Sequence, residues 1–291
     1  MTKDCSHVHG YIDPNWPRPD NSGSACIIIF GYVPSFTLGV LGVSLFALAL
    51  LLHSWLLLRY RTWFFSTVVI GTLMEIVGYV FRSLASKLNP YSVAYFVGQY
   101  FCIVVAPVFY SAAIYSLLTV MINRVGAEYA PLRPKVILWT FVSCDVVATV
   151  IQVLGASLIG SAYSNDKDPN VPNHILLAGL AFQVLAYAIF LVLYITFIHK
   201  AHAALTPRLR RFAAATLFAA LAVYLRTIIR LAETAEGLLM FLSTHEAIFG
   251  CLEFLPIILA LYIFVVFHPG RYLAAKSKSP VFKPLVQLSE L

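Results

Sequence analysis

The stretch FAAATLFAALAVYLRTIIRLAE, residues 212–233, is long enough and apolar enough to cross a bilayer, yet it contains Arg226, Arg230 and Glu233. A helix needs roughly 20 residues to span about 30 Å of hydrocarbon, and lipid offers the backbone no other hydrogen-bond partners. A central Arg or Asp costs about 2.5 to 3.5 kcal/mol on insertion scales. The stretch therefore predicts a membrane helix whose charged side chains pair with one another or meet water.

The whole chain has the composition of a protein that crosses the membrane several times. Of its 291 residues, 60% are hydrophobic and 11% are charged, and the mean hydropathy is +0.83. Such values exclude a soluble catalytic domain and are typical of polytopic membrane proteins. We predict an all-α fold with seven transmembrane helices and short loops, the longest at residues 160–174. The spans are expected at residues 32–58, 63–84, 94–122, 136–159, 175–198, 212–232 and 247–267.

Basic residues indicate how these helices are oriented. Thirteen of the twenty Lys and Arg residues lie in the loops after spans one, three and five or in the C-terminal tail, against four on the opposite side. Because short loops rich in Lys and Arg stay in the cytoplasm, the N-terminus is predicted outside and the C-terminus inside. The net charge of +7 then reflects topology, and no nucleic-acid partner is expected.

This orientation divides the chain into three parts. Residues 1–30 are predicted to form a polar extracellular segment, residues 31–268 the seven-helix transmembrane domain, and residues 269–291 a basic cytoplasmic tail that contacts anionic lipids. Cys5 and Cys26 fall on the predicted outer side, where a disulfide can form, although their spacing alone does not decide whether it does. The plasma membrane is the expected location.

Polar residues inside the spans recur at spacings that place them on one face of a helix. Four spans have such a face, formed by Glu75, Tyr79 and Arg82; by Asp145, Thr149 and Gln152; by Arg226, Arg230 and Glu233; and by Glu246, Gly250 and Glu253. Span three adds Gln99 and Tyr110 on either side of Pro107, where the missing N–H predicts a kink. His245 precedes Glu246 and is expected to join the same group.

We expect these faces to line a cavity that opens outward and narrows toward Asp145. The predicted ligand-binding residues are Glu75, Tyr79, Arg82, Gln99, Tyr110, Asp145, Gln152, Arg226, Arg230, Glu233, His245, Glu246 and Glu253. Ion pairs that only hold the helices together are the alternative. Charged residues within the membrane more often mark sites or pathways, which favours binding.

No metal site and no cofactor are predicted. His53, His199, His202 and His268 lie near the inner ends of their spans, but no HExxH or CxxC spacing supports zinc. The chain has no Walker A motif, so ATP is not expected to power it directly.

Short motifs occur in order along residues 31–270. They are Gly31-Tyr32-Val33-Pro34-Ser35, Glu75-Ile76-Val77-Gly78-Tyr79 with Arg82, Ala106-Pro107, Ala112-Ala113-Ile114-Tyr115, Asp145 with Gln152 and Gly155, Arg226 with Arg230, Glu233 and Gly237, His245-Glu246, and His268-Pro269-Gly270. With these motifs the sequence resembles the fungal lipid-translocating exporter family, seven-helix proteins linked to aminocholesterol resistance and to sphingoid long-chain bases. It departs from the family pattern at Phe249 and Glu253, where a tyrosine and then an aspartate are expected.

The resemblance implies a transporter or binder of amphipathic lipid-like molecules that gives export or resistance. The partner would be a sphingoid base, a sterol-like lipid or a lipophilic secondary metabolite, and a net acidic site favours a cationic head. Two alternatives stay open. An intramembrane cyclase, isomerase or hydrolase would use Glu75, Asp145 and Glu253 as neutral acids, although no spacing is diagnostic of such chemistry. A seven-helix receptor shares the topology, but span seven has no Lys for a retinal Schiff base.

Overall fold

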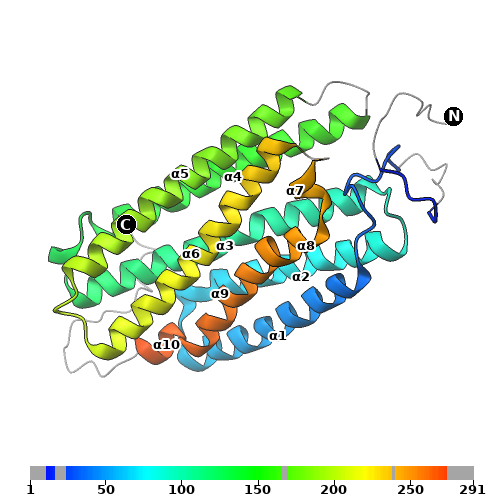
Figure 1. Ribbon diagram of the computed structural model, residues 1–291. Helices are drawn as coiled ribbons and strands as arrows, with labels where there is room; N and C mark the ends of the chain where they lie inside the picture. The colour runs from blue at the N-terminus through cyan, green and yellow to red at the C-terminus, as the bar shows by residue number, and fades with distance from the viewer. Residues whose placement is uncertain (1–10, 17–23, 165–169, 238–239, 274–291) are drawn as a thin grey trace, which may run out of the picture.

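The computed structural model describes residues 11–16, 24–164, 170–237 and 240–273, and these residues form a bundle of helices (Figure 1). The helices are α1 (Phe36–Tyr60), α2 (Ser66–Lys87), α3 (Val93–Val125), α4 (Pro134–Ser164), α5 (Asn170–Lys200), α6 (Pro207–Glu236), α7 (Phe241–Thr244), α8 (Glu246–Ile248), α9 (Leu255–Val266) and α10 (Pro269–Tyr272). Short 3-10 turns η1 (Trp63–Phe65) and η2 (Ala127–Tyr129) and a π-helix, η3 (Phe249–Phe254), complete the described structure.

Seven helical spans in the described residues are long and apolar enough to cross a membrane, as the composition predicts. The first six contain α1 to α6, and the seventh, Glu246–Tyr272, contains α8, η3, α9 and α10. The all-α prediction is confirmed for these residues, where β pairing is limited to one bridge between Ser24 and Ser92.

Local chemistry explains where the helices begin. Ser35 caps α1 by accepting a hydrogen bond from the Leu38 N–H, and Thr206 does the same for α6 with Pro207 in the first turn. The first span therefore starts at Phe36, four residues later than predicted. The expected loop at residues 160–174 is mostly helical, because α4 continues to Ser164 and α5 begins at Asn170.

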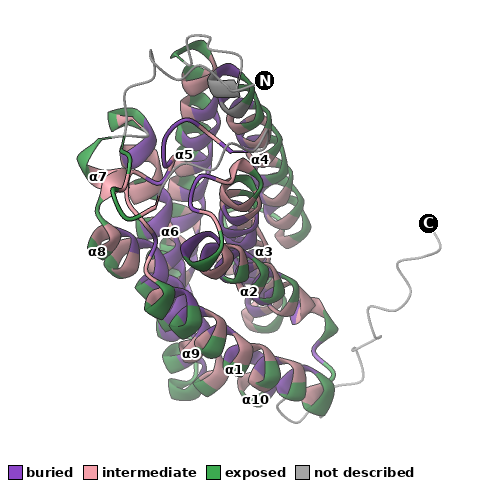
Figure 2. Cartoon of the chain, turned by 90° about the vertical axis from the view of Figure 1, so that its right-hand side faces the viewer, coloured by how far each residue is buried: buried purple, intermediate pink, exposed green. Residues whose placement is uncertain are grey.

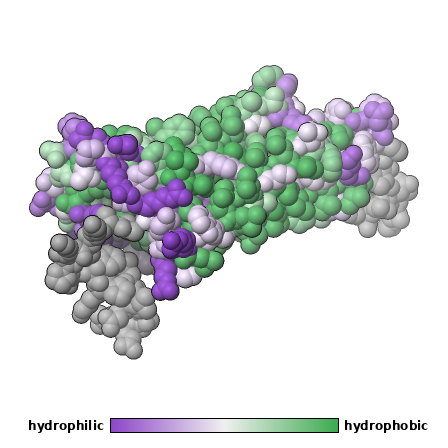
Figure 3. Space-filling model, turned by 90° about the horizontal axis from the view of Figure 1, so that it is seen from below, coloured by the Kyte–Doolittle hydropathy of each residue, from purple (hydrophilic) through white to green (hydrophobic). Residues whose placement is uncertain are grey.

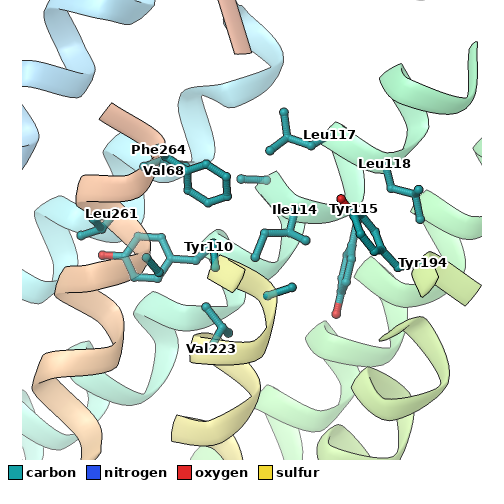
Figure 4. Packing of buried hydrophobic residues seen from close by; sticks show 14 of the residues in the cluster. Val68, Tyr110, Ile114, Tyr115, Leu117, Leu118, Tyr194, Val223, Leu261 and Phe264 are labelled. Carbon is teal, nitrogen blue, oxygen red and sulfur yellow. The ribbon is translucent and has the colours of Figure 1, made fainter. Parts of the chain in front are cut away.

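Helix α3 forms the centre of the bundle, packed against α2 and α4 and also touching α6. Its residues supply a large part of the buried core, including Tyr110, Ile114, Tyr115, Leu117 and Leu118 (Figure 4). Helices α4 and α5 pair closely at one side, where a Cβ on Gly155 would lie 2.7 Å from the Leu176 backbone nitrogen.

The outer surface is apolar where the helices would meet lipid. Leu51, Leu154 and Val192 are among the large apolar side chains that are more than half exposed. Figure 2 shows exposed residues on the outward faces of the helices and buried ones between them. On the face drawn in Figure 3, apolar side chains occupy the middle and polar ones gather toward the two ends. This distribution fits a multi-pass membrane protein.

The two ends of the bundle are built by different segments. At one end the backbone before α1 meets the end of α2 and the start of α8, through contacts of Tyr32 and Ser35. At the other end Arg208 on α6 donates a hydrogen bond to the carbonyl of Arg271 on α10, at 2.6 Å. The chain thus enters and leaves the bundle at opposite ends. The first end remains predicted, from the placement of basic residues, to face outward.

Candidate functional site

The α6 face meets Glu253 of η3 in a buried network of two arginines and two glutamates. Arg230 Nη1 lies 2.9 Å from Glu233 Oε2 and 2.8 Å from Glu253 Oε1, so it bridges both carboxylates. Arg226 Nη2 lies 3.8 Å from the other oxygen of Glu253. The Glu253 side chain is only 1% exposed. We call Arg226, Arg230, Glu233 and Glu253 the central network; if all four ionise, its charges balance.

Arg226 also replaces the backbone hydrogen bond that α3 lacks because of Pro107. Proline at position 107 has no N–H, so the carbonyl of Ile103, four residues earlier, loses its helical donor. Arg226 Nη2 donates a hydrogen bond to that carbonyl at 2.6 Å. One guanidinium therefore links the Ile103 carbonyl of α3 to the carboxylate of Glu253.

Glu253 owes its direction to the π-helix. In η3 the N–H of Leu255 bonds to the carbonyl of Gly250, five residues back, just before Pro256. The wider turn changes the phase of the span. As a result Glu246 turns to Arg82 on α2 while Glu253 turns to Arg230 on α6. The prediction that Glu246 and Glu253 share one face assumed a regular α-helix; in the structure the π-helix η3 begins between them, and the two acids pair with arginines of different helices.

A second ion pair closes the end of the bundle where α1 begins. Arg82 Nη2 lies 2.5 Å from Glu246 Oε1 and donates to the Tyr32 hydroxyl at 3.0 Å. The Ser35 N–H donates to the same Glu246 oxygen at 2.8 Å. The guanidinium of Arg82 lies over the Phe249 ring, 4.3 Å from its centroid. Burial raises the pKa of the Tyr32 phenol, which therefore stays protonated.

Glu75 lies beside the central network without joining it. Its side chain is buried, with the residue 2% exposed, and is within electrostatic range of Arg226, Arg230 and Glu253. In the part of the chain that the structure describes, its carboxyl forms no ion pair or hydrogen bond. Six buried polar atoms of predicted site residues have no hydrogen-bond partner within the described structure: the acceptors Gln99 Oε1, Asp145 Oδ1 and Glu253 Oε2, the hydroxyl of Tyr110, and the donors Arg82 Nε and Arg230 Nε. Such atoms are costly in a protein interior unless something supplies their missing bonds.

Other predicted site residues have partners of their own. Asp145 accepts a hydrogen bond from the Tyr115 hydroxyl at 2.9 Å, and Gln152 donates one to Gln183 at 2.9 Å. His245 Nδ1 is 2.7 Å from the carbonyl of Phe241. The structure therefore brings together the polar faces of α2, α6 and the seventh span, whereas the α4 face meets α3 and α5. The outward-opening cavity stays a prediction.

Several residues of the site were not in the predicted set. Tyr32 and Ser35 bind the Arg82–Glu246 pair, and the motif at residues 31–35 was the available signal for them. The Arg230 guanidinium carbon lies 4.7 Å from the centroid of the Tyr100 ring. No motif in the sequence indicated that Tyr100 belongs to the site. Tyr79, which was predicted, is buried and packs its ring against Phe249 and Phe254.

The histidines and cysteines of the described residues are not part of the central network. His53 Nε2 lies 3.1 Å from the carbonyl of Leu261, and the His53 and His268 ring centroids are 6.5 Å apart. Within the described ranges no three His, Cys, Asp or Glu residues are placed to hold a metal ion together. Cys26 is disulfide-bonded, and Cys5, the partner considered from the sequence, lies outside the described residues.

Comparisons with known proteins agree with the motifs. A family described as RTA1 like protein matches residues 68–276. The chain is 26% identical to "Sphingoid long-chain base transporter RSB1" of Saccharomyces cerevisiae, over 98% of this chain and 84% of the relative. It is 27% identical to "Protein RTM1" and to "Protein RTA1" of the same organism, each over 69% of this chain and 66% and 64% of theirs. No solved structure matches. The resemblance predicted from the sequence is confirmed.

Proposed function

Because this chain belongs to the RTA1-like protein family, we propose that it moves an amphipathic lipid with a cationic head group, such as a sphingoid long-chain base, across the plasma membrane. A general role in lipid-related membrane transport follows from its relatives. The finer proposal names the substrate class and the groups that bind it. It is supported by the charges and unfilled hydrogen bonds of the buried site.

The observation that carries the proposal is the unpaired carboxyl of Glu75 beside a network whose charges balance. Arg226 and Arg230 offset Glu233 and Glu253, and the neighbouring Glu75 has no counter-ion of its own among the described residues. A buried carboxylate without a partner is strongly unfavourable. A protonated amine would supply one positive charge and three N–H donors.

The unpartnered acceptors fit the same ligand. Glu253 Oε2 and Gln99 Oε1 are buried without donors, and a sphingoid base offers hydroxyl groups next to its amine. Its alkyl chain would lie between helices or in lipid, where burial of each CH₂ contributes about 0.8 kcal/mol. The head would thus bind the acids while the tail stays in an apolar environment throughout the crossing.

The test is export of a radiolabelled long-chain base from cells that express Glu75→Gln. Loss of one charge-assisted interaction, worth about 1.5 to 3 kcal/mol, should weaken binding roughly tenfold to a hundredfold. Glu128→Gln, at an exposed acid in η2, is the matched control and should export like the wild type. Surface abundance of all variants is measured in parallel.

Two outcomes would count against the proposal. If Glu75→Gln exports the base as well as the wild type does, at equal surface abundance, Glu75 does not bind the head group. If the N-acylated base, which has no cationic amine, is exported equally well, the site does not require a positive charge on the ligand. Mass spectrometry of the exported lipid separates transport, in which the mass is unchanged, from an enzymatic reaction.

A further inference from the structure

A second buried polar cluster lies between α3, α4 and α5, apart from the central network. The Tyr115 hydroxyl on α3 donates to Asp145 Oδ2 on α4 at 2.9 Å. The other carboxyl oxygen, Asp145 Oδ1, is buried and has no hydrogen-bond partner. The hydroxyl of Tyr187 on α5 is also buried and unpartnered, and it is close enough to Asp145 to interact electrostatically.

The surroundings of this cluster contain no group that would neutralise a carboxylate. In the described structure Asp145 forms no ion pair, and its titratable neighbours are Tyr115 of α3 and Tyr187 of α5. Tyr224 of α6 stacks on Tyr187 with centroids 5.7 Å apart. The Tyr115 ring also packs against the apolar rings of Phe141 and Phe190. The Ser111 side chain lies close to both Tyr115 and Tyr187.

Packing limits what can bind beside Asp145. The centroids of Tyr115 and Phe190 are 4.5 Å apart, Tyr115 and Tyr187 are 6.0 Å apart, and both tyrosines are 1% exposed or less. Rings at these separations are in contact, so an ammonium head or a hydrated metal ion would have to push them apart. A proton on Oδ1 needs no extra volume. It would also turn the unpartnered acceptor into a donor, in a cluster where the Tyr187 hydroxyl is unpartnered as well.

We propose that Asp145 is a proton-binding site, separate from the head-group site, that carries one proton in each transport cycle. The Asp145 carboxylic acid releases its proton to water on one side of the membrane and takes up a proton from water on the other. No bond other than O–H is made or broken, and no oxidant or reductant is involved. The coupling to transport rests on the proposed function, whereas proton binding by Asp145 does not.

Infrared spectroscopy of the purified full-length protein tests proton binding directly. At neutral pH the wild type should show the C=O stretching band of a protonated carboxylic acid, and Asp145→Asn should lose that contribution. Tyr115→Phe removes the hydrogen bond to the acid and should shift the band to higher frequency. Tyr194→Phe, which loses a bond to the Ala213 carbonyl at 2.9 Å, is the control and should leave the band unchanged. An unchanged acid band in both Asp145→Asn and Tyr115→Phe would overturn the proposal.

Transport measurements test the coupling. In vesicles with the purified protein, a pH gradient should drive accumulation of labelled long-chain base, and a protonophore should abolish it. Asp145→Asn should still bind the base but lose its response to the gradient. A gradient response retained by Asp145→Asn, or a requirement for sodium in place of a pH gradient, would overturn the proton role. Failure of the wild type to bind the base at all would instead overturn the proposed function.

Discussion

At the scale of single residues, the arginines of α6 each serve two partners. Arg230 holds Glu233 and Glu253, and Arg226 holds the Ile103 carbonyl while lying near Glu253. Isolated charges of this kind cost several kcal/mol in hydrocarbon. The contribution of each charged residue to stability therefore depends on whether its partners are present. Removal of Arg230 takes away the closest ion-pair partner of both Glu233 and Glu253.

Replacement of Arg230 by Ala should therefore destabilise the protein strongly. Two buried carboxylates lose their shared partner, and breaking such a pair typically costs about 3 to 5 kcal/mol. Arg230→Lys keeps the charge but has a single ammonium, so a smaller loss is expected. Thermal unfolding in detergent measures both, with exposed Arg211→Ala on the same helix as the control. Unfolding of Arg230→Ala at the wild-type temperature would show that the network contributes nothing.

At the scale of elements, two spans are irregular next to the central network. Helix α3 lacks one backbone hydrogen bond because Pro107 lies inside it, and the seventh span contains the π-helix η3 before Pro256. Each irregularity changes what a side chain can reach: the first frees the Ile103 carbonyl for Arg226, and the second directs Glu253 to Arg230. Irregular turns of this kind often mark functional positions in membrane helices.

A double-mutant cycle can test the link between Pro107 and Arg226. Pro107→Ala restores an N–H for the Ile103 carbonyl and should stabilise α3 by up to about 3 kcal/mol. In that background Arg226→Ala should cost less than it does with Pro107 present, because the carbonyl is no longer left unpaired. Thermal unfolding of the wild type, the two single variants and the double variant gives the coupling free energy between Pro107 and Arg226. Equal costs in the two backgrounds would show that the contact carries no energy.

At the scale of the whole molecule, two polar ends enclose an apolar middle (Figure 3). The Arg82–Glu246 pair lies at one end, and the contact between Arg208 and Arg271 lies at the other. The bias of basic residues predicts that the second end faces the cytoplasm. Head-group binding from inside the cell would then require the arrangement of helices around Glu75 to change during transport.

Epitope tags at the two termini test this orientation. On intact cells an N-terminal tag should bind an impermeant antibody, whereas a C-terminal tag should bind only after permeabilisation, because the basic loops stay in the cytoplasm. A cytoplasmic protein serves as the control for cell integrity. Accessibility of the C-terminal tag on intact cells would reverse the topology and the direction of transport.

Much of the candidate site could be predicted from the sequence because its helical faces are regular. The stripes of α2 and α6 depend only on helical period, and Arg226, Arg230 and Glu233 form one face as expected. The relation between Glu246 and Glu253 could not be predicted, because a π-helix has no clear pattern in a single sequence. The contacts of Asp145 depend on which helix packs beside α4, and short-range periodicity contains no such information.

The sequence by itself determined the seven spans, their approximate positions and the charged residues that need partners. These properties follow from the thickness of the bilayer and from the cost of charge in hydrocarbon, which act on each segment separately. Only the tertiary structure decided which partner each charge has: Arg82 with Glu246, Arg230 with Glu253, and Asp145 with Tyr115. Pairing depends on the packing and phase of whole helices, since a single turn of π-helix redirects every side chain that follows it.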